Sequence, residues 1–215
     1  DFVFTAQQYD VRVMRPGGTV GTGVRNVEWL VFTDRTIATP LAGFQYGLQI
    51  YGDVTDETLI GTAFYDILQG LEGNDTIQGF GGLDDIVGGR GDDILDGGDG
   101  DDRIDTGPGN DVVLGGAGAD LITIGPGNSR VDGGAGIDTL RYGGFGGWEV
   151  DQRNHTNLPG IVVDLGAGYL RGAAGSATVT GIENVTGTTG SDLLTGDGAA
   201  NVLTGGDEGR DVLRG

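Results

Sequence analysis

The chain has 215 residues, of which 47 are glycine, and its 32 acidic and 12 basic side chains give a formal net charge of −20. It has no Lys and no Cys, so disulfide bonds and thiolate metal sites are excluded. A net charge this negative argues against nucleic acid or an anionic membrane surface as the partner, and it favours binding of divalent cations.

Residues 1–60 carry no clear repeat, and their apolar patterning predicts a β-rich N-terminal flank or cap. The most strand-like stretch runs from Val24 to Phe32 and is apolar on both faces, so we expect it to be buried on both sides. Trp29 within it is expected to pack in the core. Asp53 and Asp56 lie in a transition segment and are expected to be solvated. A repetitive fold needs such a cap because its end coil is an open edge.

Residues 61–141 consist of nine consecutive copies of a nine-residue unit. Position four is Gly in every copy except at Phe64, and position six is Asp in every copy except at Ser129. Position eight is always aliphatic: Leu68, Ile77, Ile86, Leu95, Ile104, Val113, Ile122, Val131 and Leu140. A flexible Gly-rich linker has no reason to keep an aliphatic residue at every ninth place, so the period favours a folded repeat.

Each unit predicts a Gly-rich turn followed by one short strand. Glycine supplies the positive φ angles of tight turns. In the three residues after the Asp, the middle side chain points to one face. Two units then make one coil of a solenoid, with the position-eight side chains stacked inward. We therefore expect an all-β chain.

The repeat needs more than its core to stay folded. One aliphatic side chain contributes roughly 1.5–3 kcal/mol, whereas ordering nine residues costs roughly 1–2 kcal/mol each. Alternate units share an edge, so the Asp side chains form two ladders with a spacing of about 4.8 Å, at which like charges repel. Calcium binds carboxylate and carbonyl oxygens in a flexible shell, and would supply both the missing charge and folding free energy.

The unit resembles the repeats-in-toxin (RTX) nonapeptide, Gly-Gly-x-Gly-x-Asp-x-U-x, a calcium-binding repeat. Residues 88–96, 97–105, 115–123 and 133–141 match it in full. The resemblance implies a right-handed parallel β-roll with several calcium ions between turns two units apart. It also implies a secreted or surface bacterial protein that leaves the cell by type I secretion, with the export signal beyond this chain.

The resemblance implies that turn carbonyls and the Asp residues of two successive turns hold each ion. The implied Asp pairs are Asp75 with Asp93, Asp84 with Asp102, Asp93 with Asp111, Asp102 with Asp120, and Asp120 with Asp138. The candidate carbonyl ligands are the position-four glycines: Gly73, Gly82, Gly91, Gly100, Gly109, Gly118 and Gly136. Asp66 lacks the Gly-Gly-x-Gly turn, and Asp111 faces Ser129, so these two positions are weaker candidates.

Residues 142–186 interrupt the nonapeptide and predict wider β coils of the same solenoid, with 149–160 as a loop. Ile161 to Leu165 is a clear strand pattern. Glu183 is a candidate for either a further calcium carboxylate or a hydrogen bond at the rim. His155, the single histidine, is expected to lie on the surface.

Residues 187–215 resume the repeat and form a second block. Asp192 and Asp211 are expected to share one edge and Asn201 to face the other, which predicts one further calcium ion. We expect the chain to be part of a longer protein.

The sequence lacks the motifs of catalysis. It has no His-Glu-x-x-His, no Gly-x-Ser-x-Gly and no phosphate-binding Gly-Lys loop, so we expect a non-enzymatic module without a membrane span. The module is expected to fold on extracellular calcium and to serve secretion, scaffolding or adhesion. The alternative is a non-catalytic carrier module of an extracellular enzyme (polysaccharide-active, lipase or peroxidase) that contacts acidic glycans.

Overall fold

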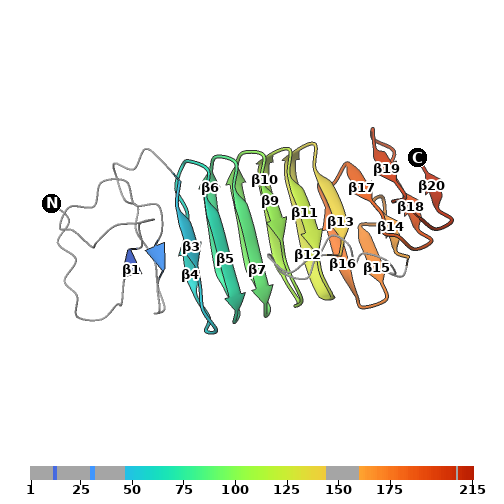
Figure 1. Ribbon diagram of the computed structural model, residues 1–215. Helices are drawn as coiled ribbons and strands as arrows, with labels where there is room; N and C mark the ends of the chain where they lie inside the picture. The colour runs from blue at the N-terminus through green and yellow to red at the C-terminus, as the bar shows by residue number, and fades with distance from the viewer. Residues whose placement is uncertain (1–11, 14–29, 32–46, 144–159, 207) are drawn as a thin grey trace.

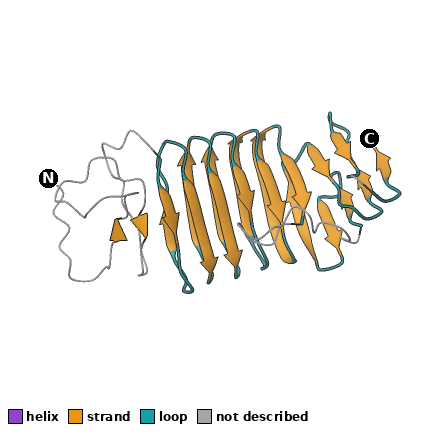
Figure 2. Cartoon of the chain, in the orientation of Figure 1, coloured by secondary structure: helices purple, strands orange, loops and turns teal. Residues whose placement is uncertain are grey.

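A computed structural model describes residues 12–13, 30–31, 47–143, 160–206 and 208–215. Most of the predicted N-terminal flank, including Trp29, lies outside these residues, as do His155 and most of the predicted 149–160 loop. The described residues contain strands and turns but no helix (Figure 2).

The strands form a parallel β-solenoid with two ten-stranded sheets that face each other (Figure 1). Sheet 1 contains, in spatial order, β1 (Arg12–Val13), β2 (Leu30–Val31), β3 (Gln49–Tyr51), β5 (Ile67–Glu72), β7 (Asp85–Arg90), β9 (Arg103–Asp105), β11 (Leu121–Ile124), β13 (Thr139–Tyr142), β17 (Asn184–Thr186) and β19 (Val202–Thr204). Sheet 2 contains β4 (Thr58–Ile60), β6 (Thr76–Gly81), β8 (Ile94–Asp99), β10 (Val112–Gly118), β12 (Gly127–Gly136), β16 (Gly175–Thr180), β15 (Tyr169–Gly172), β14 (Val162–Asp164), β18 (Leu193–Thr195) and β20 (Val212–Arg214). The predicted all-β solenoid is confirmed.

The register of the sheets follows the nonapeptide period. Ile86 in β7 pairs with Ile104 in β9, and Val113 in β10 pairs with Val131 in β12. Each strand thus stacks on the strand two units away, as the sequence predicted, so that one coil contains two units.

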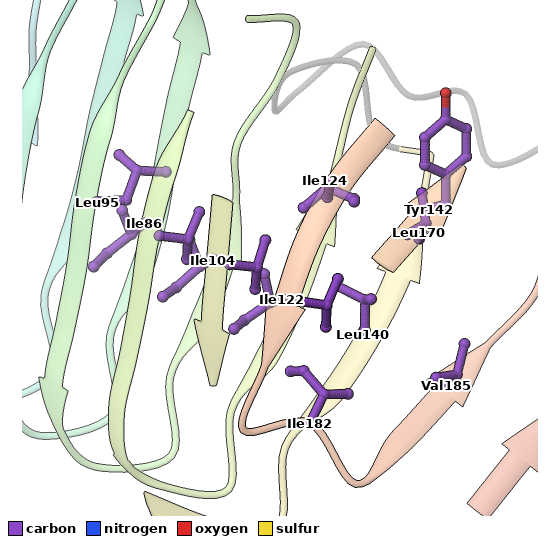
Figure 3. Close-up of a cluster of buried hydrophobic side chains, with 14 of the residues drawn as sticks. Ile86, Leu95, Ile104, Ile122, Ile124, Leu140, Tyr142, Leu170, Ile182 and Val185 are labelled. Atoms are coloured by element: carbon purple, nitrogen blue, oxygen red, sulfur yellow. The ribbon is translucent and has the colours of Figure 1, made fainter. Parts of the chain in front are cut away.

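The core is a double row of position-eight side chains. All nine of them in residues 61–141 are at most 1% exposed. Figure 3 shows Ile86, Ile104, Ile122 and Leu140 following one another along the solenoid axis. The outward positions seven and nine are partly or fully exposed in most copies, for example at Ile94 and Leu114. The core is therefore one side chain thick from each sheet.

The regular coils begin before the first recognisable copy. Strands β3 and β4, within the segment assigned from the sequence to the flank, pair in parallel with β5 and β6. Their central residues Ile50 and Leu59 are fully buried and continue the two core rows. This coil has a different turn sequence, which is why the repeat pattern did not include it.

The insertion before the second repeat block adds an antiparallel hairpin to sheet 2. Strand β16 pairs in parallel with β12, but β15 runs antiparallel to both β16 and β14. The described part of the insertion contains two coil strands, β16 and β17, which stack in parallel on β12 and β13, and the antiparallel strands β15 and β14 beside β16. The wider coils expected from the sequence stay a prediction. Sheet 1 has no such addition, because β13 pairs directly with β17. The two repeat blocks thus belong to one continuous solenoid (Figure 1).

Position two of the repeat has a left-handed backbone in seven of the nine copies, all but those with Thr62 and Gly125. Gly89, Gly98 and Gly116 have positive φ angles there, and so do the non-glycine residues Leu71 (φ 82°) and Phe80 (φ 74°). A side chain in this region costs roughly 1–2 kcal/mol because Cβ crowds the following carbonyl. The first two Gly-rich turns therefore hold local strain that the later ones avoid.

We predict that Phe80→Gly stabilises the calcium-loaded protein by about 1 kcal/mol, because it removes this strain. For a chain of this size the gain corresponds to a rise in melting temperature of about 2–4 °C. Calorimetry of the two proteins measures it. The control is Phe64→Gly, which removes a similarly exposed Phe from a residue without a positive φ and should lower the melting temperature. A decrease for Phe80→Gly as large as for Phe64→Gly would contradict the strain argument.

Candidate metal centre

The position-six carboxylates form one ladder along each edge of the solenoid. The edge 1 ladder precedes the strands of sheet 1 and contains Asp66, Asp84, Asp102, Asp120 and Asp138. The edge 2 ladder precedes the strands of sheet 2 and contains Asp75, Asp93 and Asp111. All eight are at most 2% exposed. The structure therefore brings together the Asp residues of the first block in the two rows that the sequence predicted.

One carboxylate oxygen of each ladder Asp accepts a hydrogen bond from a backbone N–H group. Oδ1 of Asp84 accepts a hydrogen bond from the backbone N–H of Asp66 at 2.7 Å, and Oδ1 of Asp102 accepts one from Asp84 at 2.8 Å. The same bond recurs along edge 2, where Oδ1 of Asp93 accepts from Asp75 at 2.8 Å. Each Asp thus ties its own turn to the preceding turn on that edge.

The other oxygen has no protein partner in six of these residues. Among the described residues, the buried Oδ2 atoms without a hydrogen bond are those of Asp75, Asp84, Asp93, Asp102, Asp120 and Asp138. An unpartnered buried carboxylate oxygen is costly, because neither water nor a donor replaces its hydration. A cation that binds oxygen would remove this cost along the whole row.

Position-one glycines let a carboxylate oxygen and a carbonyl oxygen approach the same point on the backbone. A Cβ placed on Gly97 would lie 2.5 Å from Oδ2 of Asp102 and even closer to the carbonyl oxygen of Gly115 on the next turn. Gly79 and Gly115 show the same convergence of an Asp Oδ2 and a carbonyl on one point. Calcium takes its ligands from carboxylate and backbone carbonyl oxygens at 2.3–2.6 Å. The set of oxygen donors therefore fits calcium.

The position-four glycines serve the stacking of the turns in this structure. A Cβ on Gly109 or Gly127 would overlap the carbonyl oxygen of the preceding position-four glycine, Gly91 or Gly109 respectively. The same close approach holds for Gly91, Gly100, Gly118 and Gly136, which stack on Gly73, Gly82, Gly100 and Gly118. These carbonyls point along the edge from turn to turn. Their predicted role as calcium ligands stays a prediction, whereas the position-one carbonyls are a donor set that the sequence analysis missed.

Three of the predicted ligands already have protein donors on both oxygens. Oδ2 of Asp66 accepts from the N–H of Thr62 at 2.6 Å, and Oδ2 of Asp192 accepts from the N–H of Thr188 at 2.8 Å. Oδ2 of Asp111 accepts from the hydroxyl of Ser129 at 3.4 Å. These side chains depend less on a cation than the six with a free Oδ2.

The second block contains one hydrogen bond of the kind that links successive Asp residues in the ladders. The N–H of Asp192 donates to Oδ1 of Asp211 at 3.0 Å, although an inserted residue makes their separation 19. Asn201 lies on the other edge, where its Oδ1 accepts from the N–H of Asp197. The expected sharing of one edge by Asp192 and Asp211 is seen.

Glu57 occupies position six of the coil before the first copy and was missed by the sequence analysis. Its N–H donates to Oδ1 of Asp75 at 2.8 Å, and it is only 7% exposed. A Cβ on Gly52 would lie 2.5 Å from Glu57 Oε2 and close to the carbonyl of Gly70, which is the arrangement found around Gly97. Counting back nine residues from Asp66 would have found this carboxylate.

A second, outer ladder on edge 2 needs no cation. Oδ1 of Asn74 accepts from the N–H of Asp92 at 2.7 Å, Asp92 in turn accepts from Asn110 at 2.8 Å, and Asn110 accepts from Asn128 at 3.0 Å. These residues stand at position five, where edge 1 has Tyr65, Leu83 and Ile137 instead. Edge 2 therefore has a side-chain ladder that edge 1 largely lacks.

Burial raises the pKa of the ladder carboxyls, and the backbone hydrogen bonds that they accept offset part of this rise. In Asp75, Asp84, Asp93 and Asp120 a neighbouring carboxylate raises the pKa further. The pKa of Asp84 rises to about 7, and those of Asp75, Asp93 and Asp120 rise to about 6. The first cause is desolvation in every case. Without a cation, these groups resist ionisation near neutral pH.

We predict that the metal-free protein is more stable at pH 5 than at pH 7.5. A folded-state pKa above the unfolded value contributes stability at low pH, and this contribution is lost as pH rises through about 6 to 7. The far-ultraviolet β signal of protein freed of metal by a chelating resin, recorded at pH 5 and at pH 7.5, measures the folded fraction. The calcium-saturated protein should show the opposite trend, because protons compete with the cation. A metal-free β signal that grows from pH 5 to pH 7.5 would contradict the pKa shifts.

The described residues contain no cluster of three or more His, Cys, Asp or Glu side chains suited to one metal ion. A site built from two carboxylates and several carbonyls does not need such a cluster. Within the same part of the chain, no helix has the length and apolar character needed to cross a membrane.

Comparison with known families agrees with this geometry. The chain matches the family described as RTX calcium-binding nonapeptide repeat (4 copies) at residues 51–82, 78–113, 106–140 and 178–213. A search of curated proteins found no match. The family match covers more than half of the chain, includes Glu57 and both repeat blocks, and falls on the regular coils. The chain therefore belongs to the RTX calcium-binding nonapeptide repeat family, and it is a calcium-binding β-roll module.

Proposed function

We propose that this module folds when it meets extracellular calcium and acts as a rigid segment of a secreted or surface-attached bacterial protein. The observation that carries the proposal is the row of six buried Oδ2 atoms without a hydrogen-bond partner among the described residues. A chain that places ionised oxygens in these positions is unstable until a cation arrives. Folding and calcium binding are then one event.

The proposed ligands are the free Oδ2 atoms together with turn carbonyls. Each interior site takes the Asp of one turn and a carbonyl of the next turn on the same edge, for example Asp102 with the carbonyl of Gly115. The Asp of that next turn, Asp120 in this example, completes the pair that the RTX repeat implies. Glu57 with Asp75 is a further candidate on edge 2, because Gly52 repeats the glycine geometry. When bound, calcium would supply the positive charge that offsets the ladder carboxylates and would take these oxygens as its ligands.

Coupled folding suits a protein that is exported before it folds. Calcium is scarce in the cytosol and abundant outside the cell, so the same chain would stay unfolded before type I secretion and fold after it. The proposed later role is mechanical, as a scaffold or adhesion segment. Its support is the continuous sheet pair, in which successive coils are joined by backbone hydrogen bonds such as that from the N–H of Arg103 to the carbonyl of Asp84 (2.8 Å).

Far-ultraviolet circular dichroism during a calcium titration tests the proposal. We expect the β signal to grow cooperatively with calcium and to stay near its metal-free level with magnesium. Magnesium demands a tighter octahedral shell and dehydrates reluctantly, so it fits carbonyl-rich sites poorly. A full β signal in metal-free protein that calcium leaves unchanged would refute calcium-coupled folding.

A surface hollow favours a second candidate function, that of a carrier module that contacts acidic glycans. The hollow, of about 450 Å³, lies over sheet 2 and is lined by Asn128, Arg130, Tyr169, Arg171, Ser176 and Thr178, among others. Pairing places the small side chains of β16 in the floor, between Arg130 on β12 and the Tyr169–Arg171 pair on β15. The Arg171 guanidinium stacks 4.9 Å from the ring centre of Tyr169. Such guanidiniums bind carboxylates through paired hydrogen bonds.

Binding of a polyuronate to the calcium-loaded protein tests this second function. Arg171→Ala should weaken binding at least tenfold, while binding of a neutral glucan stays undetectable throughout. The matched control is Arg103→Ala, which removes an exposed Arg from sheet 1 that lies 3.9 Å from Asp85. Equal losses for both variants would point to general charge attraction and would refute a glycan site in the hollow.

A further inference from the structure

The edge 1 ladder continues past its last nonapeptide Asp, across the insertion. The N–H of Asp138 donates to Oε2 of Glu183 at 2.8 Å, which is the bond that every earlier ladder Asp makes to the Asp of the next turn. Here the two residues are 45 positions apart instead of 18. Glu183 therefore stands where the ladder would place its next carboxylate.

The backbone holds Glu183 in that place. Strand β17 pairs in parallel with β13, with Thr139 opposite Asn184 and Leu140 opposite Val185. The N–H groups of Glu183 and Asn184 both donate to the carbonyl of Asp138, at 3.2 and 2.8 Å. The residue before β17 is thus aligned with the residue before β13, so Glu183 matches position six without belonging to a nonapeptide.

Asp138 supplies an unpartnered oxygen on the same edge. Asp138 is fully buried, and its Oδ2 has no hydrogen-bond partner among the described residues. A Cβ on Gly133 would lie 2.9 Å from this Oδ2 and closer still to the carbonyl oxygen of Gly181. Gly181 has a φ of 61°, the left-handed conformation that Gly adopts without strain. Oxygens from the first block and from the end of the insertion therefore converge beside Asp138.

We propose that Asp138, Glu183 and the carbonyl of Gly181 form a further calcium site that fastens the second repeat block to the first. The inference rests on the proposed calcium binding of the ladders and adds a site whose second carboxylate is outside the nonapeptide pattern. The ion joins the last coil of the first block to the end of the insertion, directly before the second block, so its loss weakens the attachment of the second block. Sheet 2 links the two blocks less directly, because β15 and β14 lie between β16 and β18.

The test uses Glu183→Gln in the full chain, with calcium counted by native mass spectrometry and unfolding followed by calorimetry. Gln keeps an oxygen that accepts the hydrogen bond of Asp138, so the fold is retained. We expect the variant to bind one calcium ion fewer than the unaltered chain. We also expect a new unfolding step at lower temperature, with faster amide exchange in β18, β19 and β20.

Two further variants make the result decisive. Asp138→Asn should lose two ions, because Asp138 also pairs with Asp120 in the preceding site. Glu72→Gln, at an exposed position outside the ladders, should lose none. If the unaltered chain binds no calcium, the proposed function itself fails. If it binds calcium and Glu183→Gln retains every ion, only the site at Glu183 is refuted.

Discussion

Replacing Asp102 with Asn should remove two calcium ions and lower the melting temperature of the calcium-loaded protein by about 10–20 °C. Asp102 lies between Asp84 and Asp120 in the edge 1 ladder and contributes to the sites on both sides. One site occupied at a hundred times its dissociation constant stabilises by about 2.7 kcal/mol. Two lost sites therefore cost about 5 kcal/mol, and each kcal/mol shifts the melting temperature by about 2–4 °C at this size. Calorimetry and native mass spectrometry measure the two effects.

When no metal is present, the same variant should keep a larger folded fraction than the unaltered chain, measured as the far-ultraviolet β signal. Asn keeps Oδ1 as acceptor for the N–H of Asp84, and its amide group replaces the unpartnered Oδ2. That amide can donate to the converging carbonyl of Gly115. The order of stability of the two proteins should therefore reverse when calcium is added.

Asp111→Asn is the matched control, because Oδ2 of Asp111 already accepts from Ser129. We expect a smaller loss there, of at most one ion. Equal losses at the two positions would mean that the free Oδ2 atoms do not mark the metal sites. A variant at Asp102 that is less stable than the unaltered chain with and without calcium would mean that the Asp is needed for packing alone.

The fold of the repeat could be predicted from the sequence because each copy repeats one physical requirement. A single aliphatic side chain at position eight fixes which face is buried, and the constant period fixes the register, as the pairing of Ile86 with Ile104 shows. The buried face can be predicted from a single copy, and the nine copies repeat the same pattern without interruption. The predicted Asp rows followed directly, since residues two units apart must lie on one edge.

The position-one glycines were not predicted as functional, although the sequence contains a signal for them. Position one is occupied by residues other than Gly only at Thr106 and Ile124. These two copies are also the ones whose position-six residues, Asp111 and Ser129, hydrogen-bond to each other. The rule that a free Asp requires Gly five residues earlier is present in the sequence, but only the structure shows that the two residues meet.

The insertion could not be derived in the same way. Its strands lack the period, so nothing in the local pattern shows that β15 turns back along β16. The role of Glu183 depends on that path, because it reaches Asp138 only after the chain has completed the hairpin. Pairing between strands that are far apart in the sequence depends on tertiary packing. The local sequence of one strand does not show which partner it will pair with.

Replacing Gly97 with Ala should be among the most damaging single changes in the chain, although it adds one methyl group. The new Cβ would lie 2.5 Å from Oδ2 of Asp102 and nearer still to the carbonyl of Gly115, and neither atom can move without breaking the turn. Overpacking of this kind costs about 1–3 kcal/mol, occasionally more. The methyl group would also occupy the space where the two ligand oxygens converge. We expect one calcium ion fewer and a melting temperature lower by about 10 °C.

The comparison with Gly81→Ala separates the site from a general intolerance of side chains in the turns. Gly81 also lacks a positive φ, but its Cβ would meet no atom closer than 3.4 Å, which is ordinary contact. Ala should therefore be tolerated at Gly81 with all calcium ions retained, and the lower chain entropy of Ala in the unfolded state should even favour the fold slightly. If the two variants behave alike, the position-one glycines serve the turn and not the ion. If only Gly97→Ala loses calcium, then the space beside Asp102 is the calcium site, and the repeat keeps Gly at position one to hold it open.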